Sequence, residues 1–335
     1  MSLGRGRAGR LAWAALRRAL AALGSVLGAT LLIQALVGFA PGDAADLAAN
    51  DAGLRDALSA AWGLDAPLLT RWGRFVIGAV QGELGESLTV RPGASVASLI
   101  TASAARSAGL AAAALALGLG LALPLGFGGP RARRLTVILS AAPVFLALYA
   151  VMTGLNEGAW ALIEAGRIQR PGWFALPDAE SGLRWTIGAC ALAWGSSSLA
   201  ELQAATAEEL GRVRRAPYVL AAQARGEPAW PVALRNLLPP LVEVAASQVA
   251  VVLGGLIVVE RALQLNGAGD LFWRACSQRD LPLACGLAAS AALAAKPQAK
   301  GRSRWLQARQ NRSPAPLSCS ARSTTIRPPS TTATW

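Results

Sequence analysis

Histidine is absent from this 335-residue chain, and lysine occurs only at Lys296 and Lys300. The lack of histidine excludes His-based acid–base catalysis, metal sites with histidine ligands, and Ser-His or Cys-His nucleophile pairs. The sequence also contains no G-x-x-x-x-G-K-[ST] motif, the glycine-rich loop with which many ATPases hold phosphates. We therefore expect no ATP site of that kind, no bound cofactor and no metal in this chain.

Charge is scarce as well. Charged residues form 15% of the chain and hydrophobic residues 53%, whereas about a quarter of the residues of a soluble protein are charged. This composition is typical of a membrane protein. The formal net charge of +13 could indicate nucleic-acid binding, but basic residues of multi-pass membrane proteins collect in cytoplasmic loops, and we expect no nucleic acid. The four cysteines show no CxxC or other ligand spacing, so we interpret them as packing residues.

Apolar segments of about 20 residues can cross the roughly 30 Å of hydrocarbon in a bilayer. Six such segments, the last of them short, lie at about residues 19–39, 107–127, 135–155, 185–203, 240–259 and 281–295. A signal peptide is the alternative for the first, but the segment is long for one and Pro41 follows Ala40 directly, which disfavours cleavage. The sequence thus predicts an all-α, polytopic membrane bundle of about six helices, with the sixth truncated.

The charges between these segments predict one orientation. Arginines crowd the N-terminus and the polar segments after the second and fourth spans, whereas the segment after the first span is rich in aspartate and glutamate. Cytoplasmic loops carry the excess of arginine and lysine. We therefore expect a cytoplasmic tail (1–18), a transmembrane domain (19–295) with an external segment (40–106) and a cytoplasmic loop (204–239), and a basic low-complexity tail (296–335). In the external segment, apolar residues at helical spacing predict an amphipathic helix that stops at Gly63.

The polar segment 201–240 is rich in arginine. Gly226 separates two helix-like pieces, and Pro239 and Pro240 close the second. A helix-turn-helix on the cytoplasmic face has the shape that a partner subunit can hold in a groove. An ordinary solvated loop is the alternative, and this segment alone does not decide between the two.

Three stretches resemble motifs of the permease subunits of bacterial ABC importers, in the branch that takes up oligopeptides, dipeptides and nickel. LDAPLLTRWGRFVIGAVQGELGESL (64–88) is similar to the family's external segment. YVLAAQARG (218–226), followed by Arg235-Asn236 and Leu-Leu-Pro, is similar to its cytoplasmic coupling loop. The third stretch follows the family's order and spacing at Gly254-Gly255, Val259-Glu260, Gly267-x-Gly269 and Arg279-Asp280-x-Pro282.

The resemblance implies a permease subunit of an ATP-driven, binding-protein-dependent importer, for peptides or nickel-type solutes, in the bacterial inner membrane. Its implied partners are a second homologous permease, two ABC ATPase subunits that bind the ATP, an external solute-binding protein and the lipid membrane. The resemblance assigns ATPase coupling to Tyr218, Ala221, Ala222, Gly226, Arg235 and Asn236. It assigns the external turn, where the binding protein docks, to Glu260, Gly267, Gly269, Arg279, Asp280 and Pro282.

Physical reasoning gives Glu260 a role beside this resemblance. A charged side chain at the bilayer centre costs about 2.5–3.5 kcal/mol on insertion scales, so Glu260 is expected to mark the point where the fifth span leaves the hydrocarbon. The coupling loop departs from the family pattern at Gln223 and Glu227, and Pro228 and Pro231 disfavour a regular helix after Gly226.

Other polar residues of the apolar segments leave alternatives open. Arg106, Glu243 and Gln248 could line a polar path or equally satisfy one another at a helix interface. An intramembrane enzyme would need a nucleophile among Ser196, Ser197 and Ser198, for which only Glu201 is nearby as a base. Small residues that let helices approach closely are the simpler interpretation of these serines. A phosphate-binding reading of 267–269 lacks the GxGxxG pattern.

The composition changes abruptly after Ala295, to Ser, Thr, Pro and Arg with both lysines of the chain. At about 1.5 Å per residue, residues 281–295 cover roughly 22 Å, less than the hydrocarbon core. We hypothesise that the reading frame shifts near Ala295 and that the native end of the sixth span is missing. A genuine disordered basic tail, with its lysines reaching the headgroups, is the alternative. An inactive permease remnant is a further reading of the chain as a whole.

Overall fold

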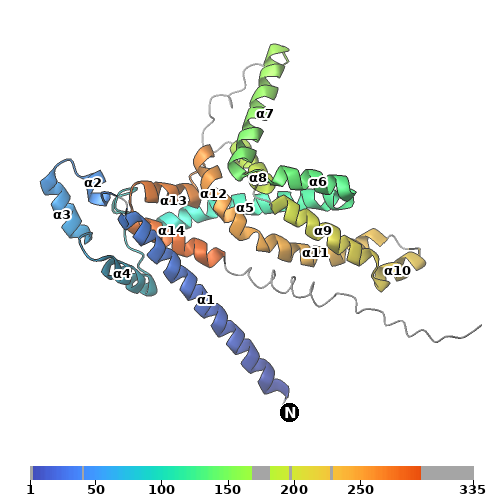
Figure 1. Ribbon diagram of the computed structural model, residues 1–335, viewed down its shortest axis with the longest axis horizontal. Helices are drawn as coiled ribbons and strands as arrows, with labels where there is room; N and C mark the ends of the chain where they lie inside the picture. The colour runs from blue at the N-terminus through green and yellow to red at the C-terminus, as the bar shows by residue number, and fades with distance from the viewer. Residues whose placement is uncertain (1–2, 40, 168–181, 196–197, 227–228, 296–335) are drawn as a thin grey trace, which may run out of the picture.

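The chain is described by a computed structural model over residues 3–39, 41–167, 182–195, 198–226 and 229–295. Within these ranges it consists of helices and loops without a β-strand (Figure 1), so the all-α prediction is confirmed. In chain order the helices are α1 (Leu3–Phe39), α2 (Ala44–Ala48), α3 (Ala52–Trp62), α4 (Leu68–Gln81), α5 (Val96–Phe127), α6 (Gly129–Ser140), α7 (Val144–Glu164), α8 (Gly182–Trp194), α9 (Ser198–Arg214), α10 (Pro217–Ala224), α11 (Ala229–Ser247), α12 (Val249–Leu263), α13 (Ala268–Ser277) and α14 (Leu281–Ala294). The predicted tail 296–335 and Ser196, Ser197, Glu227 and Pro228 lie outside the described ranges.

Helix α5 lies at the centre of the bundle (Figure 1). Its middle packs with α7, α8 and α12 around Leu110, its first turn packs with α13 and α14 around Val96, and its last turns pack with α9 and α11. Small residues along α5 allow the neighbouring helices to pack closely against it. A Cβ added at Gly118, for example, would lie 3.3 Å from Leu202 Cδ1 of α9.

Glycines also set the contact between α8 and α12. A Cβ at Gly255 would lie 2.8 Å from Leu192 Cδ2, and one at Gly188 would lie 3.0 Å from Val259 Cγ1. Without a hydrophobic driving force between helices in lipid, such small residues let backbones approach and gain dispersion contacts. In the Gly254-Gly255 pair noted in the sequence, Gly255 therefore packs against α8, whereas Gly254 is exposed.

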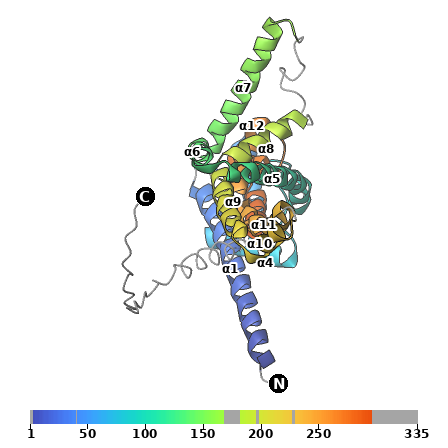
Figure 2. The same ribbon diagram turned by 90° about the vertical axis from the view of Figure 1, so that its right-hand side faces the viewer.

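Helices α1 and α7 project from the bundle in opposite directions, as both views show (Figures 1 and 2). Apolar side chains of α7, among them Phe145 and Tyr149, are exposed, as are Leu32 and Leu36 of α1. Exposed apolar helices of this length suit hydrocarbon rather than water. Helix α1 begins at Leu3, so the predicted N-terminal tail continues the first span as helix.

Three helices are long and apolar enough to cross a membrane: Ala15–Phe39, Val96–Phe127 and Val144–Glu164. A fourth candidate is the pair Leu234–Ser247 and Val249–Leu263, which are bent by 51° relative to each other. Helix α14 is a shorter apolar helix, which agrees with the short sixth span of the prediction. The count of full-length spans in the described residues is therefore smaller than the six that were predicted.

Two predicted spans are wrong as continuous helices. The third, 135–155, crosses a break at 141–143, and α7 runs from Val144 to Glu164 instead. Pro143 causes this break because proline disfavours helical geometry at the residue before it. The fourth, 185–203, is divided between α8 and α9. Gly195 at the end of α8 packs against α7, since a Cβ there would lie 2.7 Å from Val144 Cα.

The predictions for the prolines of α11 are also wrong. Pro239 and Pro240 lie inside α11, which continues to Ser247, and the chain bends only where α12 begins. Pro231 lies in the first turn of the same helix, where the backbone N–H has no intrahelical partner and proline is tolerated. By contrast, the helix predicted to stop at Gly63 is confirmed as α3 (Ala52–Trp62), which Gly63 follows with φ 63°.

Candidate functional site

Two of the three stretches that the sequence singled out lie at opposite ends of the bundle (Figure 1). One end carries residues 264–280 with α13, and we call it the turn end. The other carries residues 215–226 with α10, and we call it the loop end.

Glu260 is the centre of a buried network at the turn end. Its side chain is 1% exposed and lies one turn before the end of α12. Ser107 Oγ of α5 donates to Glu260 Oε1 at 2.6 Å. The backbone N–H groups of Gly269 and Asp270 donate to Glu260 Oε2 at 2.7 and 3.2 Å. The Ser107 hydroxyl also accepts from the Ala268 N–H at 2.7 Å.

These contacts place a carboxylate on the N-terminal turn of α13. The first N–H groups of a helix lack intrahelical partners, and the helix dipole favours negative charge there. The close approach of α13 to α12 requires glycine at two positions. A Cβ at Gly267 would lie 2.4 Å from the Glu260 carboxylate, and one at Gly269 would lie 2.8 Å from Ile257 Cα. The Gly-x-Gly pattern therefore seats α13 against α12 and not a phosphate.

A second buried carboxylate lies beside the first. Asp270 is 3% exposed and pairs with Arg261 Nη1 at 3.2 Å and with Arg274 Nη2 at 2.7 Å. Both arginines are partly solvated, with side chains 51% and 35% exposed. The pairs link the last turn of α12 to α13 and compensate the charge of Asp270 where water is excluded.

Asp280 joins the turn end to the segment that precedes α5. Its side chain is fully buried. Ser87 Oγ donates to Asp280 Oδ2 at 2.5 Å, and the N–H groups of Leu88, Thr89 and Val90 donate to the same oxygen at 3.0–3.2 Å. The 64–88 motif and the Arg-Asp-x-Pro motif are thus bonded to each other.

The remaining turn residues support this joint. Asp280 Oδ1 accepts from the Leu283 N–H at 3.3 Å and so caps α14. Arg279, with φ 59°, is half-buried, as is Pro282. A Cβ at Gly85 would contact Pro282 Cβ at 3.7 Å.

Glu260 and Asp280 therefore differ from the sequence expectation for a docking surface. Both side chains point into the protein, whereas docking needs accessible groups. Helix α12 continues past Glu260 to Leu263. Sequence reasoning missed Ser107, Ser87 and Asp270 as partners. No spacing signal could find the two serines, since Ser107 lies 153 positions from Glu260 and Ser87 lies 193 from Asp280.

At the loop end, α10 lies between α9 and α11. Val219 and Ala222 are buried at 2% and 0% exposure, while Tyr218 and Ala221 are exposed. Gly226 has φ 75°, a left-handed conformation that glycine adopts readily. The predicted piece before Gly226 is thus a helix with one face on the bundle and one face free of it.

Arg235 and Asn236 lie on the exposed side of α11. The three residues proposed for the path are not brought together by any contact in the described ranges. Arg106 donates to the Asn266 carbonyl at 3.3 Å at the turn end. Gln248 is buried at the bend and donates to Glu201 Oε2 at 2.7 Å, and Glu243 is exposed on α11.

The contact of Gln248 with Glu201 bears on the enzyme alternative. It uses one oxygen of the carboxylate that a serine nucleophile would need as its base. Ser198 is 2% exposed, and its hydroxyl makes no hydrogen bond to the residues that the structure describes. No group of three or more potential metal ligands occurs in the described part of the chain. The arrangement thus gives no support to covalent chemistry.

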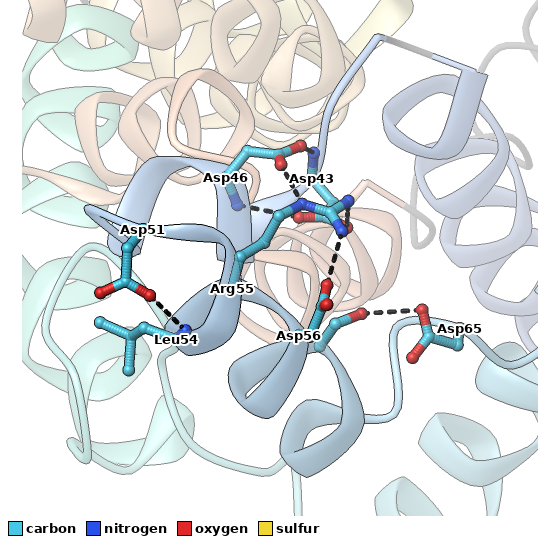
Figure 3. Close-up of polar contacts among 8 residues, drawn as sticks. Asp43, Asp46, Asp51, Leu54, Arg55, Asp56 and Asp65 are labelled. Carbon is cyan, nitrogen blue, oxygen red and sulfur yellow. Dashed lines mark hydrogen bonds and ion pairs between the residues drawn. The ribbon is translucent and has the colours of Figure 1, made fainter.

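An exposed ion-pair cluster lies at α2 and α3 (Figure 3). Arg55 of α3 pairs with Asp43, Asp46 and Asp56. The hydrogen bond from Arg55, followed by that from the Asp43 N–H, lowers the pKa of Asp46 from its ordinary value of 3.8. Asp46 raises the pKa of Arg55 in turn. Asp43 and Asp46 also form a capping box at the start of α2.

Comparison with known proteins identifies the family. The family model described as "Binding-protein-dependent transport system inner membrane component" matches residues 114–295. A protein of Brucella ovis named as a peptide permease is 30% identical over 296 residues, covering 81% of this chain and 89% of the relative, and a Brucella suis protein matches equally. The glutathione transport system permease protein GsiC of Escherichia coli K12 is 26% identical over 279 residues, covering 80% and 88%. The chain thus belongs to the inner-membrane permease family of binding-protein-dependent ABC importers, in its peptide branch, as a multi-pass protein of the inner membrane.

Proposed function

We propose that this chain forms half of the translocation path of a peptide importer and is driven by a separate ATPase that holds α10. Its partners are a second homologous permease, two ABC ATPase subunits and an external solute-binding protein. The ATP is bound by the ATPase subunits, and this chain carries no cofactor. Dipeptides and oligopeptides are the substrate class that we propose, with the names of the relatives as support.

The observation that carries this proposal is the two-faced helix α10. Its buried residues Val219 and Ala222 bind it to α9 and α11, so a force on its exposed face is transmitted to the bundle. Tyr218 and Ala221 present that face. A short helix whose free face lies in a partner's groove is a recurrent mode of recognition.

The distribution of charge supports a cytoplasmic loop end and N-terminus. Arg131, Arg133 and Arg134 are exposed or half-exposed on α6, which packs beside α9. They therefore lie at the same end as the arginines of 212–235. The acidic external segment contacts the other end through Asp280. This is the asymmetry that the positive-inside rule associates with a cytoplasmic loop end.

Co-purification with the products of the neighbouring genes tests the proposal. Ala221→Glu places a charge on the exposed face of α10, and Ala61→Glu makes the matched change at an exposed position of α3. We expect the first variant to lose its ATPase subunits and its binding-protein-stimulated ATP hydrolysis in lipid, and the second to retain both. Retention of ATPase subunits by Ala221→Glu would contradict coupling through α10.

A further inference from the structure

A recess of about 300 Å³ lies at the turn end, between the segment before α5, α5 itself and α13. Three arginines line it: Arg91, Arg106 and Arg274. They come from three different elements, so the fold and not a local sequence run gathers them. Asn266, in the turn after α12, completes the polar wall.

The charges of these arginines are unevenly compensated. Arg274 pairs with Asp270 at 2.7 Å and donates to Asn266 Oδ1 at 3.2 Å. Arg106 donates only to a neutral group, the Asn266 carbonyl, at 3.3 Å. No carboxylate lines the recess, and neither Arg91 nor Arg106 has an ion pair within the part of the chain that the structure describes. Guanidinium groups gathered around one space attract an anion into it.

Val90, Leu99 and Leu271 add apolar side chains to the lining of the recess. A ligand that satisfies both kinds of lining therefore carries an anionic group beside an apolar one. The volume is at the lower limit of small-molecule sites, which begin at about 300 Å³. It suits a carboxylate with one neighbouring side chain rather than a whole oligopeptide.

We propose that this recess binds the C-terminal carboxylate of a peptide substrate at the turn end, with Arg91 and Arg106 as its donors. Arginine holds carboxylates through two parallel N–H···O bonds, which gives both strength and orientation. The carboxylate is the one anionic group that all unmodified peptides share, so the site accepts peptides of different sequence. This assignment rests on the proposed import function and specifies the substrate group that is recognised.

The wall of the recess is held by the buried network of the turn end. Asn266 lies between the last turn of α12 and Gly267, and Arg274 is fixed by Asp270, whose N–H bonds Glu260. Glu260 and Asp270 are thus positioning residues for the recess. Their burial has a consequence beyond stability, because it sets the orientation of the arginine wall.

Arginine-specific labelling tests the site directly. The complex in nanodiscs of neutral lipid is treated with phenylglyoxal, with or without tri-alanine or its C-terminal amide, and labelled positions are quantified by mass spectrometry. We expect tri-alanine to reduce labelling of Arg91 and Arg106 several-fold, and the amide to have no effect. Arg74, exposed on α4 and outside the recess, is the internal control and should label equally throughout. Equal labelling of Arg91 with and without tri-alanine would overturn the assignment.

Two variants sharpen this result. Arg106→Gln should raise the tri-alanine concentration needed to protect Arg91 about tenfold, because one charged hydrogen-bond partner is lost, whereas Arg74→Gln should leave it unchanged.

Protection by anionic lipid alone, or by the binding protein without peptide, would instead assign the recess to a headgroup or to docking and overturn the proposal. Stimulated ATP hydrolysis without peptide protection would refute the recess and leave the import function standing. Absence of both partners and hydrolysis would refute the import function itself.

Discussion

The buried carboxylate of Asp280 accepts a hydrogen bond from Ser87 Oγ at 2.5 Å, although 193 positions separate the two residues in the chain. Three backbone N–H groups from 88–90 converge on the same oxygen. The side chain of Asp280 thus bonds the segment 87–90 to the start of α14. The recess at the turn end depends on this joint, since Val90 and Arg91 line it.

Asp280→Ala should destabilise the protein through this joint. The buried Ser87 hydroxyl loses its acceptor, at about 1–3 kcal/mol, and the part-buried N–H groups of 88–90 lose theirs. Thermal unfolding in detergent measures the effect, and faster tryptic cleavage after Arg91 locates it. Asp56→Ala is the control, because that side chain is 77% exposed. Equal unfolding temperatures for the two variants would refute the joint.

Gly267→Ala should destabilise the turn end for a purely steric reason. The new Cβ would lie 2.4 Å from the Glu260 carboxylate, and the φ of −85° at this glycine is accessible to alanine. Overpacking of this kind costs about 1–3 kcal/mol. Gly254→Ala is a matched change with nothing within 4 Å. It should stabilise α12 by about 0.5–1 kcal/mol, since glycine is disfavoured inside helices. Urea unfolding in micelles compares the two, and the prediction fails if both variants move in the same direction.

The hydrogen bond between Ser107 and Glu260 predicts coupling between α5 and α12. Ser107→Ala removes both the donor to Glu260 and the acceptor for the Ala268 N–H, a loss of about 1–3 kcal/mol. Combined with Glu260→Gln in a double-mutant cycle, the interaction energy should lie at about 0.5–3 kcal/mol. Ser98→Ala, at an exposed hydroxyl that bonds its own helix, should change stability by less than about 0.5 kcal/mol. Strict additivity of the two buried substitutions would show that the groups act independently.

The ion-pair cluster around Arg55 predicts that the stability of α2 and α3 depends on pH. The pKa of Asp46 is lowered by the hydrogen bond from Arg55, so its charged form favours the folded segment. That contribution is present above the ordinary pKa of 3.8 and is lost as the pH falls through the lower pKa of the folded protein. Peptic cleavage of α2 and α3 should therefore accelerate below about pH 4. Arg55→Gln should flatten this dependence. An unchanged pH profile in that variant would refute the role of Arg55.

The overall architecture could be predicted from the sequence where local patterns suffice. Apolar length locates α1, the end of α5 at Phe127 and the short α14, and glycine chemistry locates the end of α3 at Gly63. Averaged hydropathy fails at the break before Pro143, because apolar residues continue on both sides of it. The two prolines inside α11 show that packing around a helix can outweigh the loss of a backbone hydrogen bond.

The candidate site could be predicted only in part. Motif resemblance singled out Glu260, Gly267 and Asp280, but it did not indicate that the two carboxylates are buried. Their partners Ser107 and Ser87 come from α5 and from the segment before it, and long-range pairing leaves no periodic signal. The recess has the same origin, since its arginines belong to three elements. Such sites follow from the fold and not from spacing along the chain.

The end of α14 yields the last prediction. The helix has 14 residues, which span about 21 Å, and the family match ends at residue 295, where the composition changes. The encoding DNA, translated in the other two frames after codon 295, should therefore give an apolar continuation of about two turns in one of them, enough to reach the roughly 30 Å of a bilayer. Restoring that frame should raise the unfolding temperature and the yield of the complex. Polar translations in both frames would refute the shift and establish the basic tail as native, in which case removing 296–335 should leave α14 and its packing against α1 unchanged.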